Sequence, residues 1–210
     1  AKLTWKRFLK ISIGRRWMSY TGKYQTMLKV KVNQKLANFA GTTFDGQQFD
    51  LAQLAGSANV VLYFYPKDDT PGCTVEGVEF SELNKEFRKL NTWVLGMSRD
   101  SLDSHARFCH KYNLHIPLLS DPEGEYGQKL GIFKDGGGFK RTTILVGRDG
   151  KVKHIWENVK ANGHAAEVLS QVKKLEHQAQ KKLALGRDLG SVRRGYTKPG
   201  QRAARKSRRE

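Results

Sequence analysis

The chain has 210 residues, of which 38% are hydrophobic and 28% charged, and its formal net charge is +18 at pH 7. It contains no run of about eighteen apolar residues, so we expect no membrane-spanning helix. Two cysteines in 210 residues do not make the disulfide framework of a small secreted domain. We therefore expect a folded protein of a reducing compartment.

Apolar patterning predicts strands that alternate with helices. Phe44–Leu51 is typical of a hairpin, with Asp45-Gly46 at its turn. The pattern then predicts strand 59–65, helix 74–90, strand 92–98, helix 101–112, strand 116–119, a helical stretch near 123–130, strands 142–147 and 151–156, and a helix from about 163 to 182. This alternation indicates a layered α/β sheet in one domain of roughly 140 residues.

A cysteine stands at the junction between the first buried strand and the next helix. Cys73 lies near the end of residues 66–74, whose sequence is PKDDTPGCT. Unpaired N–H groups and the helix dipole at a helix start favour a thiolate. We therefore predict a reactive thiol here, rather than the small buried core residue that an unplaced cysteine usually is.

The same segment carries a family resemblance. Pro66, Thr70 and Cys73 match the Pro-x-x-x-Thr-x-x-Cys signature of peroxiredoxins, and residues 64–76 resemble the Q-type, or bacterioferritin-comigratory, subfamily. The resemblance covers roughly residues 36–178, with similar segments in family order at 94–100, 117–121 and 141–146. It implies a thioredoxin-like fold, a central mixed sheet flanked by helices, and a thiol peroxidase that needs no metal, flavin or haem.

The resemblance also implies roles for four residues. The Cys73 thiolate would attack one oxygen of hydrogen peroxide or an alkyl hydroperoxide, and the other oxygen would leave as water or alcohol. Arg141 would supply positive charge and N–H donors to the sulfur and the reacting oxygens. The hydroxyl of Thr70 can donate and accept there, and Pro66, which has no N–H, would shape a wall of the pocket. Without the resemblance, Arg141 would be a surface charge at a strand start.

A sulfenic acid at Cys73 needs a thiol to reduce it. Many Q-type members place that thiol five residues after the first, where this chain has Val78. Some relatives resolve from the next helix, so the resemblance allows a Cys73–Cys109 disulfide, recycled by thioredoxin or a similar dithiol. In the alternative reading, Leu102, Cys109 and Tyr112 share an apolar face and the thiol only fills the core.

Other site classes find little support. The six histidines are scattered, no Cys/His cluster has zinc spacing, and Gly136–Gly138 is typical of a loop rather than a phosphate cradle. One departure from the family precedes the hairpin, where Leu36-Ala37-Asn38-Phe39 replaces the frequent Ala-Pro-Asp-Phe. We expect no cofactor and no metal.

The excess positive charge is confined to the two ends. Residues 1–36 hold 10 Lys/Arg and no acidic residue, and residues 173–210 hold 13 basic and 3 acidic residues. The middle, 37–172, holds 15 basic and 17 acidic residues. We therefore divide the chain into a basic, aromatic N-terminal extension (1–35), a peroxiredoxin domain (36–178) and a basic C-terminal tail (179–210).

Basic ends with interleaved aromatic residues suit polyanions. One hypothesis is that they bind RNA or a ribonucleoprotein assembly, such as an organellar ribosome, with the peroxiredoxin fold as a structural subunit. The alternatives are an anionic membrane or protein surface, and disordered solubilising tails. An arginine-rich, acid-free start also resembles an organelle presequence, which favours a mitochondrial rather than a plastid location.

Overall fold

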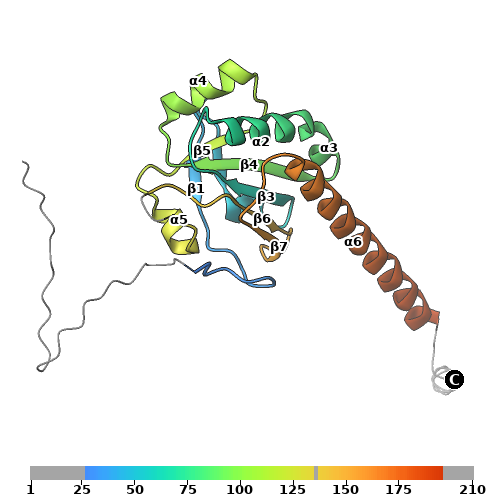
Figure 1. Ribbon diagram of the computed structural model, residues 1–210. Coiled ribbons are helices and arrows are strands. Elements are labelled where there is room, and N and C mark those ends of the chain that lie inside the picture. Colours follow the sequence, from blue (N-terminus) through green and yellow to red (C-terminus); the bar gives the residue numbers. More distant parts are fainter. Residues whose placement is uncertain (1–26, 135–136, 196–210) are drawn as a thin grey trace, which may run out of the picture.

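The structure, a computed structural model, describes residues 27–134 and 137–195. Nearly all of the predicted N-terminal extension and the last part of the C-terminal tail lie outside these residues. A central sheet has the strand order β5 (Leu118–Ser120), β4 (Thr92–Ser98), β3 (Asn59–Phe64), β6 (Thr142–Val146), β7 (Val152–Glu157). The first three run parallel, and β6 and β7 are antiparallel to their neighbours. This is the mixed, thioredoxin-like sheet that the sequence predicted (Figure 1).

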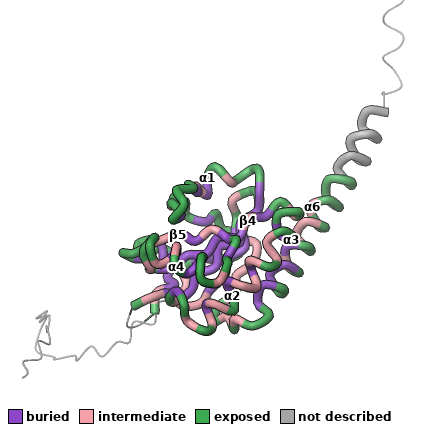
Figure 2. The backbone as a smooth tube through the Cα atoms, turned by 90° about the horizontal axis from the view of Figure 1, so that it is seen from above, coloured by how far each residue is buried: buried purple, intermediate pink, exposed green. Residues whose placement is uncertain are grey.

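Side chains alternate between the two faces of the sheet, as the period of a strand requires. Along β3, Val61 and Tyr63 point into one apolar core, whereas Val60, Leu62 and Phe64 point into another. The first core is closed by helices α2 (Pro71–Glu82), α3 (Asn84–Lys89), α4 (Leu102–Tyr112) and α6 (His164–Gly195). The second is closed by β1 (Ala40–Thr42), β2 (Gln48–Asp50), α1 (Leu51–Leu54) and α5 (Glu125–Leu130). Both faces of the sheet are therefore buried (Figure 2).

The predicted hairpin exists, but its first strand lies earlier than predicted. Ala40 pairs with Asp50 and Thr42 with Gln48, so the residues from Thr43 to Gln47 form the turn. Gly46 takes a φ of 82° there, which glycine adopts without strain. The short helix α1 that follows β2 was not predicted.

The predicted helix 74–90 is two helices. It begins three residues early, at Pro71, because proline fits the first helical position and Thr70 takes the extended conformation of an N-cap residue. It breaks at Leu83, after which α3 continues. Cys73 therefore lies inside the first turn of α2, not ahead of it.

The last helix is longer than predicted, since α6 continues to Gly195 instead of ending near residue 182. Its first turns pack on the sheet through Ala165, Val168 and Val172. The later turns project away from the domain (Figures 1 and 2), and Leu183 and Leu185 are more than half exposed. The helix runs through the predicted domain boundary at residues 178 and 179.

Candidate active site

The loop that follows β3 places a cysteine at the start of helix α2. Cys73 is the third residue of α2, where the first N–H groups of a helix have no carbonyl partner within the helix. Only 2% of Cys73 is exposed, and its thiol is not in a disulfide. A negative charge on the sulfur would face the positive end of the helix dipole.

The sheet brings an arginine to this sulfur. Phe64, the last residue of β3, pairs with Thr142 of the antiparallel strand β6, so Arg141 lies beside the end of β3. Its Nη2 donates a hydrogen bond to Cys73 Sγ at 3.3 Å. A Cβ at Gly72 would lie 3.1 Å from the same nitrogen, so the absence of a side chain there leaves room for the guanidinium.

A buried carboxyl group holds the other side of the guanidinium. Arg141 Nη1 donates to Glu76 Oε2, and Glu76 is 0% exposed. Burial raises the pKa of Glu76 to about 7, and the positive charge of Arg141 offsets only part of that rise. Its Oε1 has no hydrogen-bond partner among the described residues. Burial would lower the pKa of Arg141, but the negative charges of Glu76 and Cys73 outweigh it and the net direction is upward.

Glu76 was not among the site residues predicted from the sequence. A signal existed, because Glu76 follows Cys73 by three residues and positions i and i+3 of a helix lie on one face. An acidic residue one turn from a predicted thiolate, on the same face, is a natural partner for the arginine that the thiolate needs.

The other two residues of the signature, Pro66 and Thr70, lie at the two ends of the loop between β3 and α2. Thr70 is the residue before the first helical position, and its hydroxyl donates to the Lys67 carbonyl at 3.0 Å. Pro66 begins the loop, and its carbonyl oxygen would lie 3.6 Å from a Cβ at Gly138. The structure gives no hydrogen bond between Thr70 and Cys73.

Similarity to known proteins shows the family to which the chain belongs. The AhpC/TSA family matches residues 32–155, more than half of the chain. The chain belongs to the peroxiredoxins. Peroxiredoxin Bcp of Xanthomonas campestris is 41% identical over 121 residues, which are 54% of this chain and 76% of the relative.

Two solved peroxiredoxin structures share the fold. A cysteine-to-serine mutant of Xylella fastidiosa PrxQ superposes with a TM-score of 0.66 and 34% identity, covering 69% of this chain and 96% of that one. The bacterioferritin comigratory protein of Xanthomonas campestris, described for its alkyl peroxide reduction activity, gives 0.64 and 34% over 71% of this chain and 99% of that one. The Q-type placement predicted from residues 64–76 is thus confirmed.

The second thiol of this peroxiredoxin lies in the same core as the first. Cys109 is in the last turn of α4, 5% exposed, in the apolar cluster that also contains Cys73 and Tyr63. Burial raises the pKa of the Cys109 thiol to about 12. Neither cysteine is in a disulfide, so the structure is that of the dithiol form.

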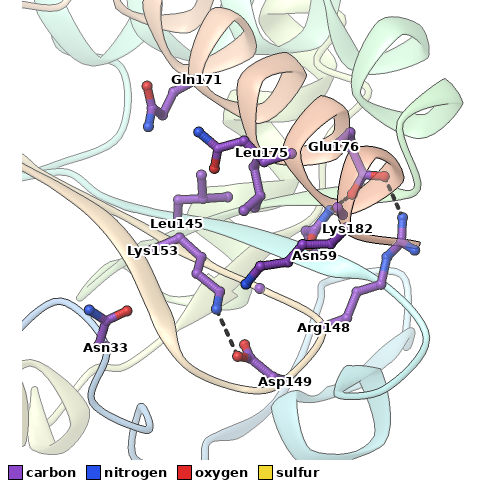
Figure 3. Close-up of a pocket in the computed structure, with 13 residues that line it drawn as sticks. Asn33, Asn59, Leu145, Arg148, Asp149, Lys153, Gln171, Leu175, Glu176 and Lys182 are labelled. Carbon is purple, nitrogen blue, oxygen red and sulfur yellow. Dashed lines mark hydrogen bonds and ion pairs between the residues drawn. The ribbon is translucent and has the colours of Figure 1, made fainter. Parts of the chain in front are cut away.

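A hollow of about 490 Å³ lies at the opposite end of the sheet, where β3 begins, between the β6–β7 turn and α6 (Figure 3). Two of its cationic side chains are already paired, Lys153 with Asp149 and Arg148 with Glu176.

Within residues 27–134 and 137–195, no three His, Cys, Asp or Glu residues are placed to hold a metal, and no helix has the length and hydropathy to cross a bilayer.

Proposed function

We propose that this peroxiredoxin reduces hydrogen peroxide and alkyl hydroperoxides through the Cys73 thiolate. The observation that carries the proposal is the 3.3 Å hydrogen bond from Arg141 to Cys73 Sγ at the first turn of α2. The alkyl peroxide reduction activity of the Xanthomonas relative supports the substrate class.

The chemistry follows from the charges around the sulfur. The thiolate attacks one peroxide oxygen, an S–O bond forms, and the O–O bond breaks. The other oxygen leaves with a proton as water or alcohol, and Cys73 becomes a sulfenic acid. Arg141 can donate both to the sulfur and to the oxygen on which negative charge develops, and donors fixed before the reaction stabilise that charge most. Glu76 holds the guanidinium in place through Nη1.

We also propose that Cys109 resolves the sulfenic acid and that thioredoxin or a similar dithiol reduces the resulting disulfide. The chain has two cysteines, and the structure packs both into one apolar cluster. The Cys109 thiol, with its pKa raised to about 12, is a poor nucleophile while buried. Resolution therefore requires the last turn of α4 to open before the two sulfurs can meet.

Peroxide consumption by the purified chain with a thioredoxin system tests both steps. Cys73→Ser should abolish turnover. Cys109→Ser should also abolish it if Cys109 resolves, whereas survival of turnover with the thioredoxin system would assign resolution to an external thiol. If the folded wild-type chain consumed no peroxide with any dithiol donor, the peroxidase proposal would be wrong.

A second proposal concerns the basic ends, which we infer bind RNA. It is supported by α6, whose later turns leave the domain with Lys181 and Lys182 exposed and lead into the basic tail. The trimmed chain for its test should begin at residue 27, because Val30 is already buried in the core. Deletion of 1–26 and 186–210 should abolish salt-sensitive RNA binding and leave peroxide turnover intact.

If the trimmed chain bound RNA as tightly as the full chain, the basic ends would not be the binding site. Binding to anionic vesicles but not to RNA would favour the membrane alternative.

The acid-free N-terminal segment also leads us to propose a mitochondrial location. Import of the full-length precursor into isolated mitochondria tests it, and import into plastids alone would contradict it.

A further inference from the structure

Two neighbouring carboxylates in the loop before α2 both bind α4, the helix that carries Cys109. Asp68 is buried and binds the first half of α4, whereas Asp69 is exposed and binds its end. Figure 1 shows α4 lying beside α2, over the same face of the sheet. The loop that positions Cys73 thus also fixes the helix of the second thiol.

Asp68 makes a buried attachment. Its carboxylate accepts hydrogen bonds from Tyr65 Oη at 2.8 Å and from Ser104 Oγ at 2.7 Å, and it lies 2.9 Å from His105 Nδ1. His105 is 0% exposed and its Nε2 lies 3.3 Å from the Leu119 carbonyl oxygen. A buried network with every member satisfied is costly to break, so this end of α4 stays in place.

Asp69 makes a weaker attachment at the other end. It accepts two hydrogen bonds from Lys111 Nζ, at 2.9 and 2.7 Å, and one from the Tyr112 hydroxyl at 2.6 Å. These hydrogen bonds, chiefly that from Lys111, lower the pKa of Asp69, so the carboxylate is charged at neutral pH. The side chains of Asp69 and Lys111 are about half exposed, and ion pairs exposed to water are weak.

The turn that Asp69 holds is the turn that contains Cys109. The Cys109 carbonyl accepts the N–H groups of Asn113 and Leu114, which close the helix end. Apolar and ring contacts also hold this turn: Phe108 and Tyr112 pack against the core, and His110 lies edge-on to Phe44. The side-chain hydrogen bonds that the structure gives the last two residues of α4 all go to Asp69. Release of Asp69 therefore frees this turn first, while Asp68 keeps the rest of the helix attached.

We propose that Asp69 is a positioning residue that latches the last turn of α4 to the Cys73 loop and so controls how often the Cys109 thiol becomes exposed. On the function proposed above, this sets the rate of resolution. In that step the Cys109 sulfur attacks the sulfenic sulfur of Cys73, an S–S bond forms and the S–O bond breaks. The oxygen leaves with the proton of the Cys109 thiol and the proton of the sulfenic acid, as water.

The latch can be tested without peroxide. In the full chain carrying Cys73→Ser, Cys109 is the only thiol, and its reaction with N-ethylmaleimide measures how often the turn opens. Asp69→Asn and Tyr112→Phe should each raise the labelling rate about threefold, as expected for loss of exposed contacts. Asparagine suits the left-handed backbone of Asp69, whose φ is 53°, so the loop itself is preserved.

Glu86→Gln is the matched control, because it removes an equally exposed ion pair, with Lys89, on a different helix. It should leave Cys109 labelling unchanged. The labelling should also depend little on low urea concentrations, because local opening exposes far less surface than global unfolding. The latch would be refuted by unchanged labelling in both Asp69→Asn and Tyr112→Phe, or by labelling with the full urea dependence of unfolding.

Single-turnover oxidation then separates the latch from the proposed resolving role. With Cys73 restored, Asp69→Asn should accelerate disulfide formation about threefold, while sulfenic acid formation, trapped with dimedone in the Cys109→Ser background, keeps its rate. If labelling rises but no Cys73–Cys109 disulfide ever forms, the latch stands and Cys109 is not the resolving thiol. A parallel fall in sulfenic acid formation would make Asp69 a support of the Cys73 site and overturn the proposal.

Discussion

Replacement of Glu76 by glutamine should change how the stability of the protein depends on pH. Burial raises the pKa of Glu76 from 4.5 to about 7 in the native state. Each unit of pKa is worth about 1.4 kcal/mol, so the native state becomes less stable by about 3 kcal/mol as this carboxyl ionises. The unfolded chain releases the proton first, and the loss accumulates as the pH rises from 4.5 to about 7.

The assay is urea unfolding of the wild-type chain and of Glu76→Gln between pH 4.5 and 8.5. Other titrating groups cancel in the difference between the two proteins. Relative to the variant, the wild type should lose about 3 kcal/mol of unfolding free energy over this range, with no further loss above about pH 8. A difference that stayed constant would mean that folding does not raise the pKa of Glu76, and the prediction would be wrong.

Glu86→Gln is a suitable control for this series. The hydrogen bond from Lys89 lowers the pKa of that exposed carboxylate. A lowered native pKa stabilises the folded protein above the unfolded value, so any pH dependence must have the opposite sign. Because the native pKa of Glu86 lies below the unfolded value of 4.5, most of this dependence falls below pH 4.5. The stability of Glu86→Gln should therefore stay nearly parallel to that of the wild type between pH 4.5 and 8.5.

Three further changes have definite expected outcomes. Arg141→Met should slow the oxidation of Cys73 by about 100-fold in stopped-flow measurements with hydrogen peroxide, because a fixed donor to the reacting atoms is lost; a change below threefold would contradict that role. Gly96→Ala should lower the unfolding free energy by about 2 kcal/mol, because the added Cβ would lie 2.7 Å from the Tyr63 ring. Gly41→Ala should be tolerated, because the nearest atom to its added Cβ lies at 3.5 Å. Asn113→Val should cost about 1–2 kcal/mol, because Asn113 ends α4 with a left-handed φ of 51°, and Asn113→Gly should not; equal urea midpoints for the two variants would refute this.

Local sequence patterns predicted the framework of the site. An apolar run without polar interruption placed β3, and the proline and cysteine spacing placed the start of α2 within three residues. Arg141 was predicted from its position before a strand that resembles the family, and the register of β6 against β3 brings it to Cys73. Such signals suffice because a strand and the helix that follows it are adjacent in the chain.

Apart from the contact of Arg141 with Cys73, which the family resemblance implied, contacts between distant segments were not predicted. Asp69 and Lys111 are 42 residues apart, and nothing in either segment indicates that they meet. Glu76 is charged, and charge alone predicts a solvated side chain, so its complete burial against Arg141 was not predicted. The only signal was its spacing of three residues from Cys73. The prediction ended α6 too early because the segment beyond residue 182 contains Gly186 and Gly190, which weaken a helix, although no proline interrupts it before residue 195.

Both thiols lie in one core, and only the dithiol form of the chain can pack that core as it is found here. The Cys73–Cys109 disulfide proposed above would require part of this packing to open. Reduction of the disulfide would restore this packing and the free energy of folding that it contributes. The oxidised protein should therefore accept electrons more readily than an unstructured peptide with the same cysteines. Mutations that weaken the packing of Phe108, the residue next to Cys109, should accordingly make the protein harder to reduce.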